Sequence, residues 1–195
     1  VQLETASSTN LIGNGDIEVN ADGWLPANYI ANGEFESDII DTIPAGWAGL
    51  GAAITKVTTE HNLGLGSTKV VTTAAADDGA RTTTLSTGLS PSKTYTFTIY
   101  AKAASGSFGT LELGRSEDAG STDTSCLTGQ TVTTAWAMYT CTFTTGGAVS
   151  GGSYVYVKQT DATARTFYID SASLTTATVT RTTGEFNTGA ASVQV

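Results

Sequence analysis

The sequence has few of the residues needed to bind nucleic acid, coordinate zinc or cross a membrane. Nine Lys and Arg residues stand against 18 Asp and Glu, so the formal net charge is −9. Because binding to phosphates and to anionic lipid depends on Lys and Arg, we expect no nucleic-acid partner and no membrane partner. One His and two Cys do not supply a tetrahedral zinc site. The sequence also lacks the run of about 18 apolar residues that predicts a transmembrane helix.

Catalytic motifs are absent too. The single histidine, His61, lies in Glu-His-Asn-Leu-Gly, and no motif links it to a nucleophile. Gly-x-Ser-x-Gly, which marks the strained serine elbow of many hydrolases, does not occur. The acidic pairs Asp77-Asp78 and Asp16/Glu18 lie in turn-rich segments, and nothing places two carboxylates across a cleft as a glycosidase requires. We therefore expect no enzymatic activity.

What the sequence has in abundance is Thr, Ser, Gly and Ala, with 39% hydrophobic residues. Threonine favours strands, and no segment shows helical periodicity over three turns. Short runs between turn signals predict an all-β sandwich with strands at Ala53–Thr58, Thr68–Thr73, Ala80–Leu85, Thr94–Ala101, Gly109–Gly114, Ala135–Thr144, Tyr154–Gln159 and Thr166–Leu174.

Alternation assigns the two faces of these strands. Tyr95, Phe97 and Ile99 share one face of their strand, and threonines fill the other. Val155 and Val157 similarly lie opposite three larger side chains, Tyr154, Tyr156 and Lys158. We expect Tyr95, Phe97 and Ile99 to face the core, and likewise Val155 and Val157.

The two cysteines, Cys126 and Cys141, flank a turn and a strand-like run from Thr131 to Tyr139. This pattern predicts a disulfide that closes a loop or hairpin and adds about 3 kcal/mol of stability. A disulfide indicates an extracellular setting. The alternative is a pair of buried free thiols in a cytosolic protein.

Acidic residues occur near both ends of the predicted sandwich. Glu34 and Glu36 lie in Asn32–Trp47, which we interpret as an acidic first strand, and Asp170 lies in the last predicted strand. Calcium takes six to eight oxygens, many of them from carbonyls, so a few carboxylates suffice to pin two chain ends together. The alternative is that the two glutamates are solvated strand residues.

Six segments occur in the order typical of one family: Asn-Gly-Glu-Phe-Glu (32–36), Pro-Ala-Gly-Trp (44–47), Gly-Ser-Thr-Lys-Val-Val (66–71), Leu-Ser-Pro-Ser-Lys-Thr-Tyr-Thr-Phe-Thr-Ile-Tyr-Ala-Lys-Ala (89–103), Thr-Thr-Ala-Trp-Ala-Met-Tyr-Thr-Cys-Thr-Phe-Thr (133–144) and Thr-Phe-Tyr-Ile-Asp-Ser-Ala-Ser-Leu (166–174). Together they resemble carbohydrate-binding modules of the family 4, 9 and 22 type, over about residues 29–176. The resemblance implies a β-jelly roll and a glycan or polysaccharide partner, although one fold hosts unrelated functions.

The resemblance also implies a structural Ca²⁺ site. Carried over residue by residue, the side-chain ligands are Glu36 and Asp170. Main-chain oxygens are expected from Glu34 and from a turn running from Gly66 to Lys69.

The aromatic residues on which sugars stack in the family have few counterparts in this sequence. The loop that often carries a Trp reads Ala75–Ala80 here, and Trp47 and Trp136 match positions that are structural in the family. The remaining candidates are Tyr100, Tyr154 and Tyr156, which strand alternation places off the core face. The alternative is that the tyrosine pair packs against an N-terminal arm.

We divide the chain into an arm (1–28), a jelly-roll domain (29–176) and a C-terminal tail (177–195). The arm contains Ile12–Glu18, a partial copy of Ile30–Glu36, and the tail ends in a strand-like run, Ala191–Val195. Two functions fit this organisation. One is an extracellular, non-catalytic carbohydrate-binding module. The other is a structural subunit of a filament, adhesin or virion appendage that contacts copies of itself through its arms.

Overall fold

The computed structural model describes residues 28–83, 85–86, 88–176, 180–187 and 190–194. One compact unit spans Asn28–Leu174. The predicted arm, its partial repeat and residues 177–179 of the predicted tail lie outside the described residues, Asn28 excepted. The described residues form no helix of the length and apolarity that a membrane span requires.

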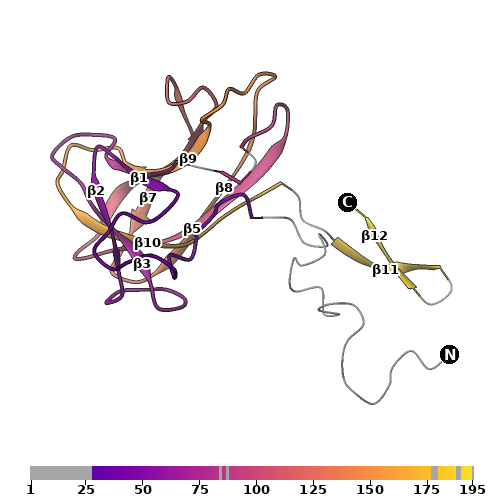
Figure 1. The fold of residues 1–195 in the computed structure, drawn as a ribbon, viewed down its shortest axis with the longest axis horizontal. Helices are drawn as coiled ribbons and strands as arrows, with labels where there is room; N and C mark the ends of the chain where they lie inside the picture. The colour runs from indigo at the N-terminus through magenta and orange to yellow at the C-terminus, as the bar shows by residue number, and fades with distance from the viewer. Residues whose placement is uncertain (1–27, 84, 87, 177–179, 188–189, 195) are drawn as a thin grey trace, which may run out of the picture. The chain divides into compact units, whose positions relative to one another are not determined.

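The unit from Asn28 to Leu174 is a sandwich of two antiparallel five-stranded sheets, as predicted (Figure 1). The first sheet, which we call the charged sheet, has the order β1-β4-β9-β6-β7. Its strands are β1 (Trp47–Leu50), β4 (Gly79–Thr82), β9 (Tyr154–Gln159), β6 (Phe108–Ser116) and β7 (Asp123–Val132).

The second sheet, which we call the threonine sheet, has the order β2-β3-β10-β5-β8. Its strands are β2 (Ala53–Val57), β3 (Ser67–Val71), β10 (Thr166–Thr175), β5 (Thr94–Ala103) and β8 (Ala137–Thr144). Separately, β11 (Thr180–Asn187) and β12 (Ala190–Gln194) form a two-stranded hairpin. The strand-like run expected over Ala191–Val195 is observed as β12 up to Gln194, and Val195 lies outside the described residues.

The core lies where the alternation places it. Tyr95, Phe97 and Ile99 of β5 are buried, whereas Thr94, Thr96 and Thr98 point outward. Leu111, Leu113, Val155 and Val157 of the charged sheet are fully buried opposite Val70, Phe167 and Ile169 of the threonine sheet. Each such side chain contributes roughly 1.5–3 kcal/mol by leaving water, which makes this layer the main source of stability.

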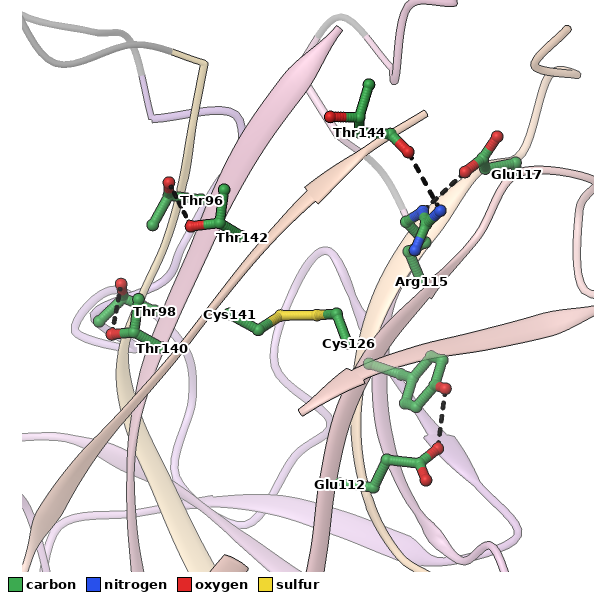
Figure 2. The surroundings of a disulfide bond; sticks show 11 residues. Thr96, Thr98, Glu112, Arg115, Glu117, Cys126, Thr140, Cys141, Thr142 and Thr144 are labelled. Carbon is green, nitrogen blue, oxygen red and sulfur yellow. Dashed lines mark hydrogen bonds and ion pairs between the residues drawn. A yellow bond between two sulfur atoms is a disulfide. The ribbon is translucent and has the colours of Figure 1, made fainter. Parts of the chain in front are cut away.

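The two sheets are also joined covalently. Cys126 on β7 forms a disulfide with Cys141 on β8, across a Cα–Cα distance of 5.7 Å (Figure 2). The disulfide is confirmed, but it bridges edge strands of different sheets rather than closing a simple hairpin. It therefore holds the sandwich together at the β7/β8 side.

The predicted acidic first strand is wrong. Residues 31–46 form turns and loop, and regular strand begins only at Trp47. Asn32 and Asp38 organise this loop: Asn32 Nδ2 donates to Asp38 Oδ2 at 2.6 Å and to the Ala45 carbonyl at 2.9 Å. The segment is therefore held by side chain–backbone hydrogen bonds, and its glutamates are free to approach other loops.

Candidate functional site

The outer face of the charged sheet, opposite the core, carries a compact group of polar and aromatic side chains. They lie on β4, β6, β7 and β9 and on the turn before β4, which the sheet order brings side by side. We call this group the tyrosine–charge cluster; it consists of Asp77, Arg81, Glu112, Asp123, Tyr154, Tyr156 and Lys158.

Lys158 is at the centre of the cluster. Its Nζ lies 3.2 Å from Asp77 Oδ1, 3.5 Å from Glu112 Oε1 and 3.4 Å from Asp123 Oδ2. Burial by itself lowers the pKa of this amine, but the three carboxylates outweigh that effect and raise the pKa above its ordinary value. The ammonium ion therefore stays charged and ties three strands and a turn together.

The two tyrosine hydroxyls are fixed by the same carboxylates. Tyr156 donates to Glu112 Oε1 at 2.9 Å, and Tyr154 donates to Asp123 Oδ1 at 2.8 Å (Figure 2 labels Glu112). Burial raises the pKa of both phenols, and the neighbouring carboxylates raise them further. Both phenols are therefore neutral donors.

Gly114 makes room for this packing. A Cβ at this position would lie 2.3 Å from Tyr156 Oη and 2.5 Å from the Thr124 carbonyl oxygen. Any larger residue would displace the ring, so the glycine allows the end of the Tyr156 side chain to pack directly against β6.

The structure corrects the expectation that sugars stack on the tyrosine pair. Tyr154 is 4% exposed and Tyr156 is 0% exposed. The Arg81 guanidinium lies 4.7 Å from the Tyr154 ring centroid, and Lys158 Nζ lies 4.7 Å from that of Tyr156. Because cations of the sandwich itself cover the rings, these faces do not accept a pyranose. The side chains at the rim of the cluster remain accessible, and the Asp77 side chain is 60% exposed.

Tyr100 does not join this group. It lies on β5 of the threonine sheet, half-buried and paired in register with Met138. The three predicted ligand tyrosines therefore fall on two different sheets, and the structure brings only two of them together.

The predicted calcium ligands converge on one loop, residues 60–66. Asp170 Oδ2 accepts hydrogen bonds from the Asn62 and Leu63 amides at 2.7 and 3.1 Å. Glu36 Oε1 accepts from the Leu65 and Gly66 amides at 2.9 and 3.1 Å. The two carboxylates, 134 positions apart in the sequence, therefore hold adjacent parts of the same loop.

Glu34 also reaches this region, because its Oε2 accepts a hydrogen bond from Ser171 Oγ at 3.2 Å. Asp170 is fully buried, and burial raises its pKa against three backbone donors, with Glu34 adding to the rise. Lys69 does not take part as expected. It lies within β3, paired with Thr55 on one side and Tyr168 on the other, so its carbonyl belongs to the sheet rather than to a turn.

The oxygen donors present at this loop are of the kind that Ca²⁺ prefers. In the described part of the chain, no ion pair reaches Glu34, Glu36 or Asp170. The buried Lys56 lies beside this region, because its Nζ donates to the Glu36 carbonyl at 2.6 Å. Nor do the described residues contain three or more His, Cys, Asp or Glu side chains grouped to hold a metal. Any ion here would need main-chain oxygens as well.

Sequence reasoning missed part of the tyrosine–charge cluster. Glu112 was detectable, because Leu111 and Leu113 alternate with it and leave it on the outer face. Asp123 and Arg81 carry no such signal. Asp123 begins a strand with no apolar alternation, and Arg81 reaches Tyr154 only through the pairing of β4 with β9.

Comparison with known proteins gives one family match. A family model described as "Carbohydrate binding domain" matches residues 27–164. No curated protein matches the chain.

Solved structures share the fold. A xylan-binding domain from family 22 is 24% identical, has a TM-score of 0.61 and covers 77% of this chain and 96% of that chain. The C-terminal family 22 module of Clostridium thermocellum Xyn10B is 24% identical, with a TM-score of 0.60 and coverages of 75% and 95%. At these identities the likeness establishes the fold alone.

Two larger proteins also match. An N-terminal module pair of Clostridium thermocellum xylanase 10B, solved with xylohexaose, is 19% identical with a TM-score of 0.57, over 67% of this chain and 26% of that chain. An arabinofuranosidase, MgGH51, is 18% identical with a TM-score of 0.61, over 80% and 27%. This chain thus spans about a quarter of the length of these two proteins.

Proposed function

Because this chain belongs to the carbohydrate-binding domain family, we propose that it is a non-catalytic module that binds a neutral polysaccharide at the tyrosine–charge cluster. The family match favours this function over that of a self-assembling structural subunit.

The observation that carries the choice of site is the fixed array of charged groups on the outer face of the charged sheet. Three carboxylates and two cations are held by one another and by two phenols, at the distances given above. Sugar hydroxyls need donors and acceptors in fixed positions, and preorganised charged partners give the strongest such hydrogen bonds. Asp77, Asp123 and Arg81 are the exposed or half-exposed members that a ligand would meet first.

The charge of the cluster restricts the ligand class. Asp77, Glu112 and Asp123 against Arg81 and Lys158 leave one net negative charge. This charge would repel an anionic polysaccharide, whereas it does not weaken the binding of a neutral one. Since both tyrosine faces are covered, binding rests on hydrogen bonds rather than on ring stacking.

Calorimetric titration with xylohexaose and cellohexaose tests the proposal. We expect Asp123→Asn to weaken binding at least about tenfold, because it removes a charged acceptor that also positions Tyr154 and Lys158. Thr142→Val, on the outer face of the other sheet, is the matched control and should bind as the wild type does. Equal affinity of Asp123→Asn and wild type, or no heat with either oligosaccharide, would contradict this site.

A second part of the proposal is a structural Ca²⁺ ion at the 60–66 loop. Glu36 and Asp170 would supply side-chain oxygens, and Glu34 and Gly66 main-chain oxygens. The support is electrostatic. The carboxyl of Asp170 is fully buried beside Glu34, with no ion-pair partner among the described residues. A cation would relieve this charge imbalance and fix the loop.

We also propose an extracellular setting. The Cys126–Cys141 disulfide supports it, because such bonds persist in oxidising compartments and are rare in the cytosol.

A further inference from the structure

An open pocket of about 470 Å³ lies at the end of the sandwich where β6, β7 and β8 approach one another. The groups that matter are Arg115, Glu117, Asp118, Thr122, Thr124 and Thr144. Arg115 alternates on β6 with Gly114 and Ser116, so it points to the opposite side of the sheet from Glu112. The Arg115 side chain therefore lies on the opposite face of the sheet from the tyrosine–charge cluster.

Arg115 is held in one orientation. Its Nε donates to Glu117 Oε1 at 2.6 Å, and its Nη2 donates to the Thr144 carbonyl at 3.2 Å (Figure 2). The guanidinium also lies 4.6 Å from the centroid of the Phe143 ring. A guanidinium fixed on three sides presents its remaining N–H groups in a rigid fork, which suits recognition of paired oxygens.

The two carboxylates of the pocket are equally ordered. Glu117 Oε2 accepts from the Gly146 amide at 2.8 Å, which ties the loop after β8 to the end of β6. Asp118 Oδ1 accepts from Ser116 Oγ and from the Thr122 amide, each at 2.8 Å. These bonds lower the pKa of Asp118, the Thr122 amide most of all, so the group is an ionised acceptor at neutral pH.

The balance of groups points to one ligand class. One cation against two carboxylates disfavours an anion, and the guanidinium beside the carboxylates disfavours a metal ion. The described lining contains threonine hydroxyls but no aromatic side chain, which disfavours a flat apolar ligand. A neutral polyol fits, because its hydroxyls act as both donors and acceptors. The volume lies in the range typical of small-molecule sites.

We propose that this pocket is a second carbohydrate subsite, which takes one or two neutral sugar units through hydrogen bonds to Arg115, Asp118 and the hydroxyls of Thr122 and Thr124. The proposal rests on the carbohydrate-binding function put forward above. It adds a site at the end of the sandwich, which would let one module contact two polysaccharide chains or two stretches of one chain. Linking two weak contacts in this way raises overall avidity without any new contact.

Amide-resolved NMR titration of the full chain with xylohexaose and with cellohexaose tests the subsite. We expect two separate groups of shifted signals, one at Thr122 and Gly146 in the pocket and one at Tyr156 and Lys158 in the cluster. Asp118→Asn keeps the capping geometry and should weaken the pocket response about tenfold while leaving the cluster response unchanged. Asp123→Asn should have the converse effect.

Each outcome decides between the two sites. Shifts confined to the cluster in the wild type, or a pocket response that Asp118→Asn leaves unchanged, would overturn the subsite and leave the main site standing. Shifts confined to the pocket would uphold the subsite and overturn the cluster. An absence of shifts with both oligosaccharides would overturn both.

Discussion

The outer faces of the two sheets have opposite chemistry although the same strand alternation produces both. On the charged sheet, a buried ammonium ion meets three carboxylates, two of which accept hydrogen bonds from tyrosine hydroxyls. On the threonine sheet, β5 and β8 present three cross-strand hydroxyl pairs, Thr94–Thr144, Thr96–Thr142 and Thr98–Thr140, at 2.9, 3.1 and 3.1 Å. Figure 2 shows two of these pairs on the far side of the disulfide from Glu112.

This difference separates a surface suited to specific recognition from one that only contacts water. The threonine hydroxyls satisfy one another, and their neutral pairs remain exposed to water. Lys158 and Glu112, at the centre of the charged face, are largely withdrawn from water and depend on their partners, so removing one leaves the others unsatisfied. We therefore expect substitutions to be costly on the charged sheet and mild on the threonine sheet.

Replacing the central lysine should show the largest effect. Lys158→Met would leave three carboxylates without their cation and should lower the free energy of unfolding by about 4 kcal/mol. Lys102→Met is the matched control, since Lys102 lies on β5, has an 18% exposed side chain and pairs with a single carboxylate among the described residues, that of Glu60. Lys102→Met should lower the free energy of unfolding by less than about 1 kcal/mol. Urea denaturation of both variants measures the contrast, and equal losses would remove the distinction between the faces.

A metal at Asp170 would give the threonine sheet a cationic anchor comparable to Lys158. If the proposed Ca²⁺ binds, about 100 Kd of free ion should add about 2.7 kcal/mol of stability, which chelator removes. Asp170→Ala should abolish this dependence, and differential scanning calorimetry with and without chelator measures it. Asp161→Ala, a half-exposed acidic residue paired with Arg165, serves as the control and should retain the calcium effect. A melting temperature unchanged by chelator would reject the metal.

The strands show how far sequence reasoning reaches. β9 was predicted with its observed bounds, because Val155 and Val157 alternate with large side chains between clear turns. β7 was not predicted as a strand. It is an edge strand whose residues are mostly exposed or half-buried, so no face carries a continuous apolar pattern. β1 was missed as well, because Ala48 and Gly49 give a weak strand signal.

The candidate site shows where that reasoning stops. Alternation placed Tyr154, Tyr156 and Lys158 on one face correctly, yet it gave no information about what covers that face. The cover comes from Arg81 and from carboxylates on other strands, and only the sheet order brings them together. In the same way, the disulfide could be predicted as a bond but not as a link between two sheets.

The phenols of the charged sheet should also give that face a pH response. Burial, followed by the bond to Glu112, raises the pKa of Tyr156 above its ordinary value of 10.0. The folded state therefore keeps this proton above pH 10 while the unfolded state loses it. Stability from this group is fully present below pH 10 and falls as pH rises further, by up to about 1.4 kcal/mol per pH unit. Tyr156→Phe should have a shallower decline in urea-derived stability between pH 10 and 11. A decline of equal slope in wild type and Tyr156→Phe would argue against the raised pKa.

The smallest effect is expected from the hydroxyl pairs, and it is the most direct check on the threonine sheet. Thr142→Val keeps the shape and the strand preference of the residue but removes one partner of the 3.1 Å bond to Thr96. Because both hydroxyls reach water, the survivor regains a partner from solvent, and the loss should be about 0.5 kcal/mol. The double variant Thr96→Val/Thr142→Val removes both partners and should be no less stable than the single variant, since two valines then pack directly across the strands. Urea denaturation resolves these differences if all variants are measured together. A loss above about 2 kcal/mol for Thr142→Val would mean that the pairs act as a connected network, and the two faces would then differ in charge but not in cooperativity.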